Sequence, residues 1–151
     1  IAFLLKRPLG YPCTSADALA AVDGVATAME IIDSRYKNFK FSLEDVVADN
    51  ASSSSFVVGP WCRPDSNLDN LGMVMEFNGR PVQIGSSAAI LGHPVRSLVA
   101  AARLTSEAGE KLEAGWIVMA GGATAAEALL PGINVRNTVE GLGSVSFNVL
   151  A

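Results

Sequence analysis

The sequence has few of the residues that build the commonest metal and redox sites. It contains one histidine, and its two cysteines, Cys13 and Cys62, form neither a CxxC pair nor the spacing of a zinc site. A zinc site is therefore not expected. Two cysteines in a chain of this size favour a reduced, cytoplasmic protein, with a disulfide between them as the alternative.

Clustered basic residues and long apolar runs are also missing. The formal net charge is -4 and the longest basic run is Lys6-Arg7, so neither a nucleic acid nor an anionic membrane is expected as a partner. No stretch approaches the roughly 18 consecutive apolar residues of a membrane-spanning helix. The basic pair follows the apolar run IAFLL instead of preceding it, which argues against a signal peptide.

Hydrophobic residues, in contrast, are abundant. They make up 50% of the 151 residues, whereas charged residues make up 17%. A chain of this length fits one domain with a core of ordinary size. Because so little charge is available to cover the surface, we expect a homo-oligomer, with a well-buried monomer as the alternative.

Many short strands and few helices are predicted, which indicates an α+β domain dominated by mixed β-sheet. Asn78-Gly79 supplies the tight turn of the clearest hairpin. Pro94 is expected in the first turn of a helix that Gly109 ends. The predicted strands are 1–5, 25–32, 56–58, 71–77, 80–84, 116–120, 135–139 and 144–150, and the other helices are 16–22 and one that begins at 42–45.

The stretch 29–55 concentrates the polar chemistry of the chain. Glu30 lies in the apolar, strand-like run 25–32, where an unpaired charge would be costly to bury. Its carboxylate therefore needs a cation, hydrogen bonds or a proton, and a metal ion is one such cation. The alternative is a salt bridge with Arg35 or a lysine.

Further polar groups follow at close spacing, and each has a structural alternative. Asp33 and Arg35 either pair with each other or contact a substrate. Asp49 and Asn50 can form the end of a helix, and the serines from 52 to 55 can be caps, although we favour a site role for at least one of them.

Three other positions are ambiguous. His93, which precedes Pro94, is expected to be structural more often than catalytic. Gly121-Gly122 allows close approach of either a ligand or another strand. Lys37 and Lys40 are expected to be solvated charges, with steering of a dianionic substrate as the alternative.

Five segments occur in an order that is typical of one family: EIIDSRYKNFKF, VVADNASS, LGHP, GGATAA and GLGSVSF. Through nearly its whole length the sequence resembles the hydratase/decarboxylase branch of the fumarylacetoacetate hydrolase superfamily. The resemblance implies a mixed β-sheet roll with a few short helices. It also implies that Mg²⁺ (or Mn²⁺) binds to three carboxylates, two in an E-x-E pair and a third that corresponds to Glu30.

In that family the E-x-E pair and the catalytic lysine lie before the strand that matches IAFLL. We therefore expect residues 1–151 to be a C-terminal catalytic-type domain that lacks its upstream segment, with the catalytic lysine outside this chain. Either a longer polypeptide has been cleaved and the upstream fragment stays associated, or the chain is a truncated product.

The implied activity is metal-dependent decarboxylation of a small dianionic 2-oxo acid, 2-oxo-3-hexenedioate, in catechol meta-cleavage degradation. Hydration of 2-hydroxypenta-2,4-dienoate and an inactive fragment are the alternatives, and the pathway hydratase is a candidate partner. Hydrogen bonds to the substrate carboxylates are expected from Asn50, Ser52 and Ser53. Gly121, Gly122 and Thr124 are expected to form the pocket wall, with backbone N–H groups facing the anion.

Overall fold

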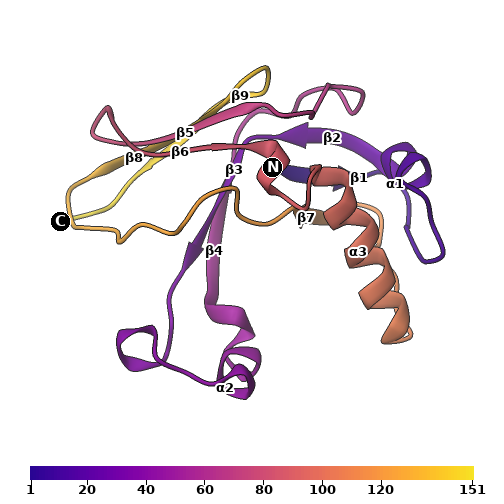
Figure 1. The fold of residues 1–151 in the computed structure, drawn as a ribbon, viewed down its shortest axis with the longest axis horizontal. Helices are drawn as coiled ribbons and strands as arrows, with labels where there is room; N and C mark the ends of the chain where they lie inside the picture. The colour runs from indigo at the N-terminus through magenta and orange to yellow at the C-terminus, as the bar shows by residue number, and fades with distance from the viewer.

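Three β-sheets and three α-helices make up the structure, a computed structural model that describes all 151 residues (Figure 1). One sheet has the strand order β2-β1-β7 and another the order β6-β5-β8-β9, while β3 and β4 form a two-stranded ribbon. The strands are β1 Ala2–Leu5, β2 Val22–Ala26, β3 Ala28–Ile32, β4 Ser53–Val58, β5 Gly72–Phe77, β6 Arg80–Ser86, β7 Ile117–Met119, β8 Asn134–Val139 and β9 Gly143–Asn148, and the α-helices are α1 Ser15–Ala21, α2 Leu43–Ala48 and α3 Pro94–Glu107. The predicted α+β class is confirmed, and all neighbouring strands in this chain run antiparallel.

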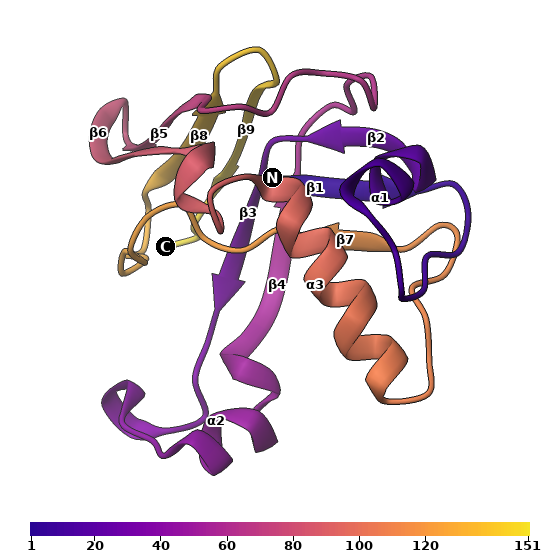
Figure 2. The same ribbon diagram turned by 45° about the vertical axis from the view of Figure 1, so that its right-hand side comes forward.

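The main core lies where α1 and α3 cover the three-stranded sheet (Figure 2). Phe3 on β1 and Leu98 on α3 are both fully buried in it. Helical spacing of Val95, Leu98, Val99 and Ala102 in the sequence predicts the buried stripe of α3. Val95, Leu98 and Ala102 are buried as predicted, whereas Val99 is only partly buried. None of the helices combines the length and apolar character that crossing a bilayer requires.

Helix α1 begins as predicted but ends earlier. The Thr14 hydroxyl accepts a hydrogen bond from the Asp17 backbone N–H, and the Asp17 carboxylate accepts one from the Thr14 N–H, which completes a capping box. The predicted helix 16–22 is one residue too long at its C-terminal end, because Val22 already belongs to β2 and pairs with Leu5. Val22 is fully buried, so its packing in the sheet prevails over continuation of the helix.

The predicted strand 25–32 is two strands that belong to different sheets. β2 ends at Ala26 and pairs with β1, whereas β3 begins at Ala28 and pairs with β4. Thr27, between them, is fully buried, and its hydroxyl donates to the carbonyl of Gly143 at 3.1 Å. The apolar run continues through this joint, which is why periodicity alone does not locate it.

The predicted hairpin at Asn78-Gly79 is confirmed, and the predicted strands 135–139 and 144–150 also pair with each other. β5 and β6 are joined by Asn78 and Gly79, which have φ angles of 49° and 76° and so form the expected tight turn. β8 and β9 pair around the turn at Gly141. This sheet supplies Val135 and Val139 to the buried interior.

The ribbon β3–β4 projects away from the two larger sheets and ends in α2 (Figures 1 and 2). We call residues 28–58 the arm. β4 begins at Ser53, so the strand predicted at 56–58 is longer and includes three of the four serines. The arm therefore carries the whole polar stretch in which the sequence concentrates candidate site residues.

Replacing Leu98 by alanine is expected to lower the free energy of unfolding by about 2–5 kcal/mol, because the side chain is fully buried in the core. Urea denaturation monitored by circular dichroism measures this change. Leu104→Ala is the matched control on the same helix, since Leu104 is 56% exposed, and it should change the value by about 0.5 kcal/mol or less. Equal losses in the two variants would contradict this placement of the core.

Candidate functional site

Glu30 is exposed, so the prediction that its carboxylate is buried is wrong. It lies near the middle of β3, directly opposite Phe56 on β4. Because the arm is a two-stranded ribbon that stands away from the larger sheets, no other layer covers this position. The carboxylate takes part in no ion pair, and the expected alternative of a salt bridge with Arg35 is not formed.

An unpaired carboxylate is a hard oxygen donor of the kind that Mg²⁺ and Ca²⁺ prefer. Nowhere in the chain, however, do three or more His, Cys, Asp or Glu side chains gather in a group that could hold a metal ion. Glu30 therefore fits one ligand position of a divalent cation, and this chain does not by itself build a complete set.

Arg35 pairs with Asp49 instead of Asp33. Its Nε lies 3.1 Å from Asp49 Oδ1, and its backbone N–H donates to Asp49 Oδ2 at 3.1 Å. Its contact with Asp33 is a hydrogen bond that Arg35 Nη1 donates to the Asp33 backbone carbonyl at 3.2 Å. The buried Asp49 carboxylate thus closes the tip of the arm, which leaves the exposed Asp33 side chain free of ion pairs.

The motif after Asp49 forms a left-handed turn. Asn50, Ala51 and Ser52 have φ angles of 50°, 54° and 59°, a conformation that costs about 1–2 kcal/mol for a residue with a Cβ. The Ser52 hydroxyl is buried and donates to Asp49 Oδ2 at 3.3 Å. Strain of this kind persists only where neighbouring contacts fix the backbone, and such positions cluster at functional sites.

The serines therefore occupy different environments. Ser52 faces Asp49, whereas Ser53 opens β4 opposite Ile32 and is half-buried. Ser54 is the extra residue where the strand register shifts, and it is exposed. Nothing in the run of four serines distinguishes Ser54 from its neighbours, although a β-bulge often re-aims a side chain beside a site.

Ser53 and Glu30 lie on the same ribbon at a distance that suits a small ligand. Glu30 is opposite Phe56, which is three residues from Ser53 along β4. At roughly 3.3 Å per residue, this separation is about 10 Å along the strand. The arrangement brings a candidate metal ligand and a candidate hydroxyl donor to one side of the molecule.

The exposed segment that follows β7 packs on β6, and it carries Gly121, Gly122 and Thr124. In both views this segment passes β3 near the base of the arm (Figures 1 and 2). Gly121 has a φ of 99°, which favours glycine, and no atom lies within 4 Å of the position of a Cβ there. Gly121 is therefore not required for close packing against another strand. Close packing between this segment and β6 requires Gly85 instead, because a Cβ there would lie 2.6 Å from Thr124 Cγ2.

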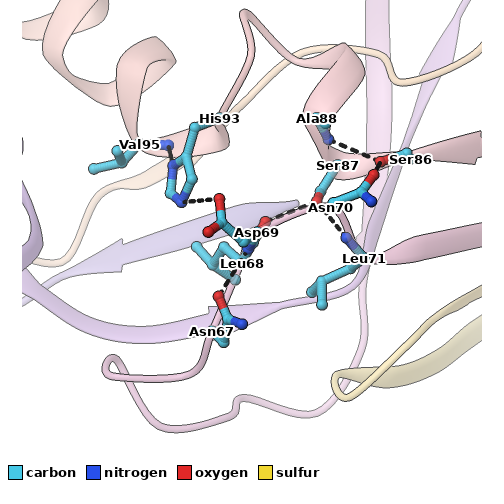
Figure 3. Close-up of polar contacts among 10 residues, drawn as sticks. All are labelled: Asn67, Leu68, Asp69, Asn70, Leu71, Ser86, Ser87, Ala88, His93 and Val95. Carbon is cyan, nitrogen blue, oxygen red and sulfur yellow. Dashed lines mark hydrogen bonds and ion pairs between the residues drawn. The ribbon is translucent and has the colours of Figure 1, made fainter.

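His93 has a structural role, as expected. Its Nδ1 accepts a hydrogen bond from the Val95 backbone N–H at 3.1 Å and so caps α3, while its Nε2 lies 3.8 Å from Asp69 Oδ1 (Figure 3). The fully buried Ser87 hydroxyl donates to the Leu68 carbonyl and accepts from the Leu71 N–H, both at 2.7 Å. These contacts fasten the loop before β5 to the start of α3.

The remaining polar candidates either face solvent or contact residues close to them in the fold. Lys37 and Lys40 are exposed and form no ion pair. Partial desolvation and the nearby carboxylates of Asp45 and Asp49 raise the pKa of Tyr36, whose ring packs edge-on against Phe41. Both cysteines are free, and the disulfide considered as an alternative is not formed.

Comparison with known sequences gives a consistent set of relatives. The family described as "Fumarylacetoacetate (FAA) hydrolase C-terminal" matches residues 1–150. A 4-oxalocrotonate decarboxylase from a Pseudomonas species is 62% identical over 148 residues, which are 98% of this chain and 58% of that protein. A 2-keto-4-pentenoate hydratase from Paraburkholderia xenovorans (strain LB400) is 37% identical over 148 residues, which are 96% of this chain and 55% of the hydratase.

Solved structures agree with these sequences. The 4-oxalocrotonate decarboxylase from Pseudomonas putida G7, complexed with magnesium and adipate, matches with a TM-score of 0.93 and 45% identity over 99% of this chain and 58% of that chain. A second structure of that decarboxylase, complexed with calcium and acetate, gives a TM-score of 0.90 and covers 57% of that chain. This chain therefore spans somewhat more than half the length of these relatives.

The strained turn of the arm can be tested with glycine. Ala51→Gly is expected to raise the free energy of unfolding by about 0.5–1 kcal/mol, because glycine adopts a positive φ without the clash of a Cβ. Urea denaturation provides the measurement. Ala100→Gly, inside α3, is the matched control and should lower the value by about 0.5–1 kcal/mol. Destabilisation by both substitutions would show that Ala51 does not hold this conformation in solution.

Proposed function

We propose that this chain, which belongs to the fumarylacetoacetate hydrolase family, is the C-terminal part of a metal-dependent 4-oxalocrotonate decarboxylase. The family resemblance predicted from five sequence segments is confirmed. The observation that carries the proposed activity is the 62% identity to a 4-oxalocrotonate decarboxylase across 98% of this chain. The reaction converts 4-oxalocrotonate (2-oxo-3-hexenedioate) to 2-hydroxypenta-2,4-dienoate and CO₂ in catechol meta-cleavage degradation.

Glu30 would supply this chain's ligand to a divalent cation. Its carboxylate is exposed and has no competing ion pair, and structures of a related decarboxylase are complexed with magnesium or with calcium. When bound, Mg²⁺ would act as a Lewis acid toward the carbonyl of a 2-oxo acid. The other ligands, an E-x-E pair, and the catalytic lysine would come from an upstream segment, as the family resemblance implies.

The remaining residues of this chain would bind and orient the dianionic substrate. Ser53 lies about 10 Å from Glu30 along the ribbon, so its hydroxyl can donate to the carboxylate at the far end of a six-carbon diacid. Asn50, on the exposed left-handed turn, would donate its side-chain N–H groups to the same anion. Ser52 would act on the substrate indirectly, because its hydroxyl already donates to Asp49 and thereby fixes the turn.

Gly121, Gly122 and Thr124 would form the other wall of the site. They lie on a segment that is held against Gly85 of β6, and a bare glycine backbone leaves its N–H groups open to an anion. Backbone donors held in advance need little reorganisation when the substrate binds.

Hydration of 2-hydroxypenta-2,4-dienoate is the second candidate function. Its support is the 37% identity to a 2-keto-4-pentenoate hydratase over 96% of this chain. The identity to a decarboxylase is 25 percentage points higher, 62% against 37%, over a similar span. Assaying CO₂ release and hydration with the same preparation distinguishes the two activities.

We further propose that the protein acts as a cytoplasmic homo-oligomer. Six large apolar side chains on the arm are exposed, which is a high density for a segment of this size. They are Ile32, Phe39, Phe41, Leu43, Val47 and Phe56. An upstream fragment or the hydratase of the pathway would be further partners, and the molecular mass of the native protein tests these assemblies.

Glu30→Gln is expected to reduce Mg²⁺-dependent CO₂ release from 2-oxo-3-hexenedioate by about 100-fold or more, because an amide is a weaker ligand than a carboxylate for a hard cation. The assay uses the natural full-length polypeptide, whose composition is checked by denaturing intact-mass analysis. Glu110→Gln removes another exposed carboxylate, outside the arm, and should leave the rate unchanged. Wild-type rates in Glu30→Gln would rule out metal ligation by Glu30.

Ser53→Ala is expected to raise the KM for the substrate by about 10-fold with a smaller effect on kcat, because it removes a hydrogen bond to a charged carboxylate. Steady-state kinetics with saturating Mg²⁺ measure both constants. Ser55→Ala is the control, since Ser55 lies two residues further along β4 and is exposed to solvent, whereas Ser53 is half-buried. A KM that rises equally in both variants would exclude a specific contact at Ser53.

A further inference from the structure

An open groove lies outside the arm, between α3 and the segment that leads into α1. It has a volume of about 310 Å³ and is lined by Tyr11, Ser15, Arg96, Val99, Ala100 and Arg103. We call it the α1–α3 groove. It shares no residue with the arm or with the segment 121–124, and the proposed decarboxylation does not use it.

Two arginines make the groove locally positive in a chain with a net charge of -4. Arg96 and Arg103 are seven residues apart on α3, which is about 10.5 Å along the helix axis and close to two turns. Arg96 takes part in no ion pair, and Arg103 pairs only with the exposed Glu107, one turn further on. An exposed pair of this kind contributes little and is readily replaced by another anion.

The surface between the two guanidinium groups is apolar. Val99 and Ala100 lie between the arginines on α3 and contribute their side chains to the groove. Tyr11 and Ser15 supply the opposite wall. This wall is held in place because the Tyr11 backbone N–H donates to the Ser106 hydroxyl of α3 at 2.9 Å.

We propose that the α1–α3 groove binds a small aliphatic dicarboxylate. Each guanidinium would take one terminal carboxylate through paired N–H donors, and the carbon chain would lie on Val99 and Ala100. The groove thus selects a diacid whose carboxylates are separated by a short apolar chain. Such a ligand belongs to the same chemical class as the proposed substrate. The binding prediction itself stands independently of the proposed activity.

Adipate, titrated into the ¹⁵N-labelled natural protein in the presence of EDTA, tests this site. EDTA removes divalent cations, so a metal-dependent complex at Glu30 does not contribute. We expect saturable shifts of the Val99 and Ala100 amide signals with a Kd of about 1 mM. Arg96→Gln/Arg103→Gln should weaken binding about 10-fold or more, whereas Arg80→Gln, at the β5–β6 hairpin, should not change it. Hexanoate, with one carboxylate, should bind about 10-fold more weakly than adipate.

Three results would overturn the proposal. They are the absence of saturable shifts at these amides, equal binding by the double variant and the wild type, and equal binding of adipate and hexanoate. Circular dichroism tests whether the double variant is folded, which is expected because both substituted side chains are exposed. If the protein binds adipate at the groove but releases no CO₂ from 2-oxo-3-hexenedioate, the proposed activity alone is refuted. If it releases CO₂ but does not bind adipate at the groove, this site alone is refuted.

Discussion

The joint at Thr27 is the constraint on which the position of the candidate site depends. Its buried hydroxyl donates to the Gly143 carbonyl, and the Asn137 side chain donates to the Ala28 carbonyl at 3.4 Å. Gly59 closes the joint, since a Cβ there would lie 3.2 Å from the Ser144 carbonyl oxygen. The base of the arm is therefore fastened to β8 and β9, and Glu30 follows only three residues after Thr27.

Beyond this joint the arm has no hydrophobic core of its own, and polar contacts at its tip stabilise it. A two-stranded ribbon alone is marginally stable in water. Here the buried Asp49 carboxylate bonds Arg35 and Ser52, and a capping box between Ser42 and Asp45 starts α2. These contacts offset the cost of the left-handed turn, so polar side chains can remain exposed along the ribbon and available to a ligand.

The sequence predicts those features that depend on local chemistry. Asn78-Gly79 specifies the hairpin turn, and the spacing of Val95, Leu98 and Ala102 specifies the buried face of α3. The sequence does not reveal where the run 25–32 changes sheets, because Thr27 looks like any β-branched strand residue until Gly143 is placed beside it. The prediction that Glu30 is buried fails for a similar reason. An apolar run predicts a strand, but it does not show whether another layer of the fold packs over that strand.

The run of four serines shows that residue type alone cannot identify which side chain contacts a ligand. All four hydroxyls have the same donor and acceptor groups, so sequence chemistry cannot rank them. The structure separates them by position: Ser52 bonds to Asp49 inside the turn, Ser53 begins β4, and Ser54 occupies the bulge. Because a strand alternates its side chains, a register shift of one residue changes which hydroxyl faces a ligand near Glu30. The bulge is therefore as much a determinant of the proposed substrate contact as the serines themselves.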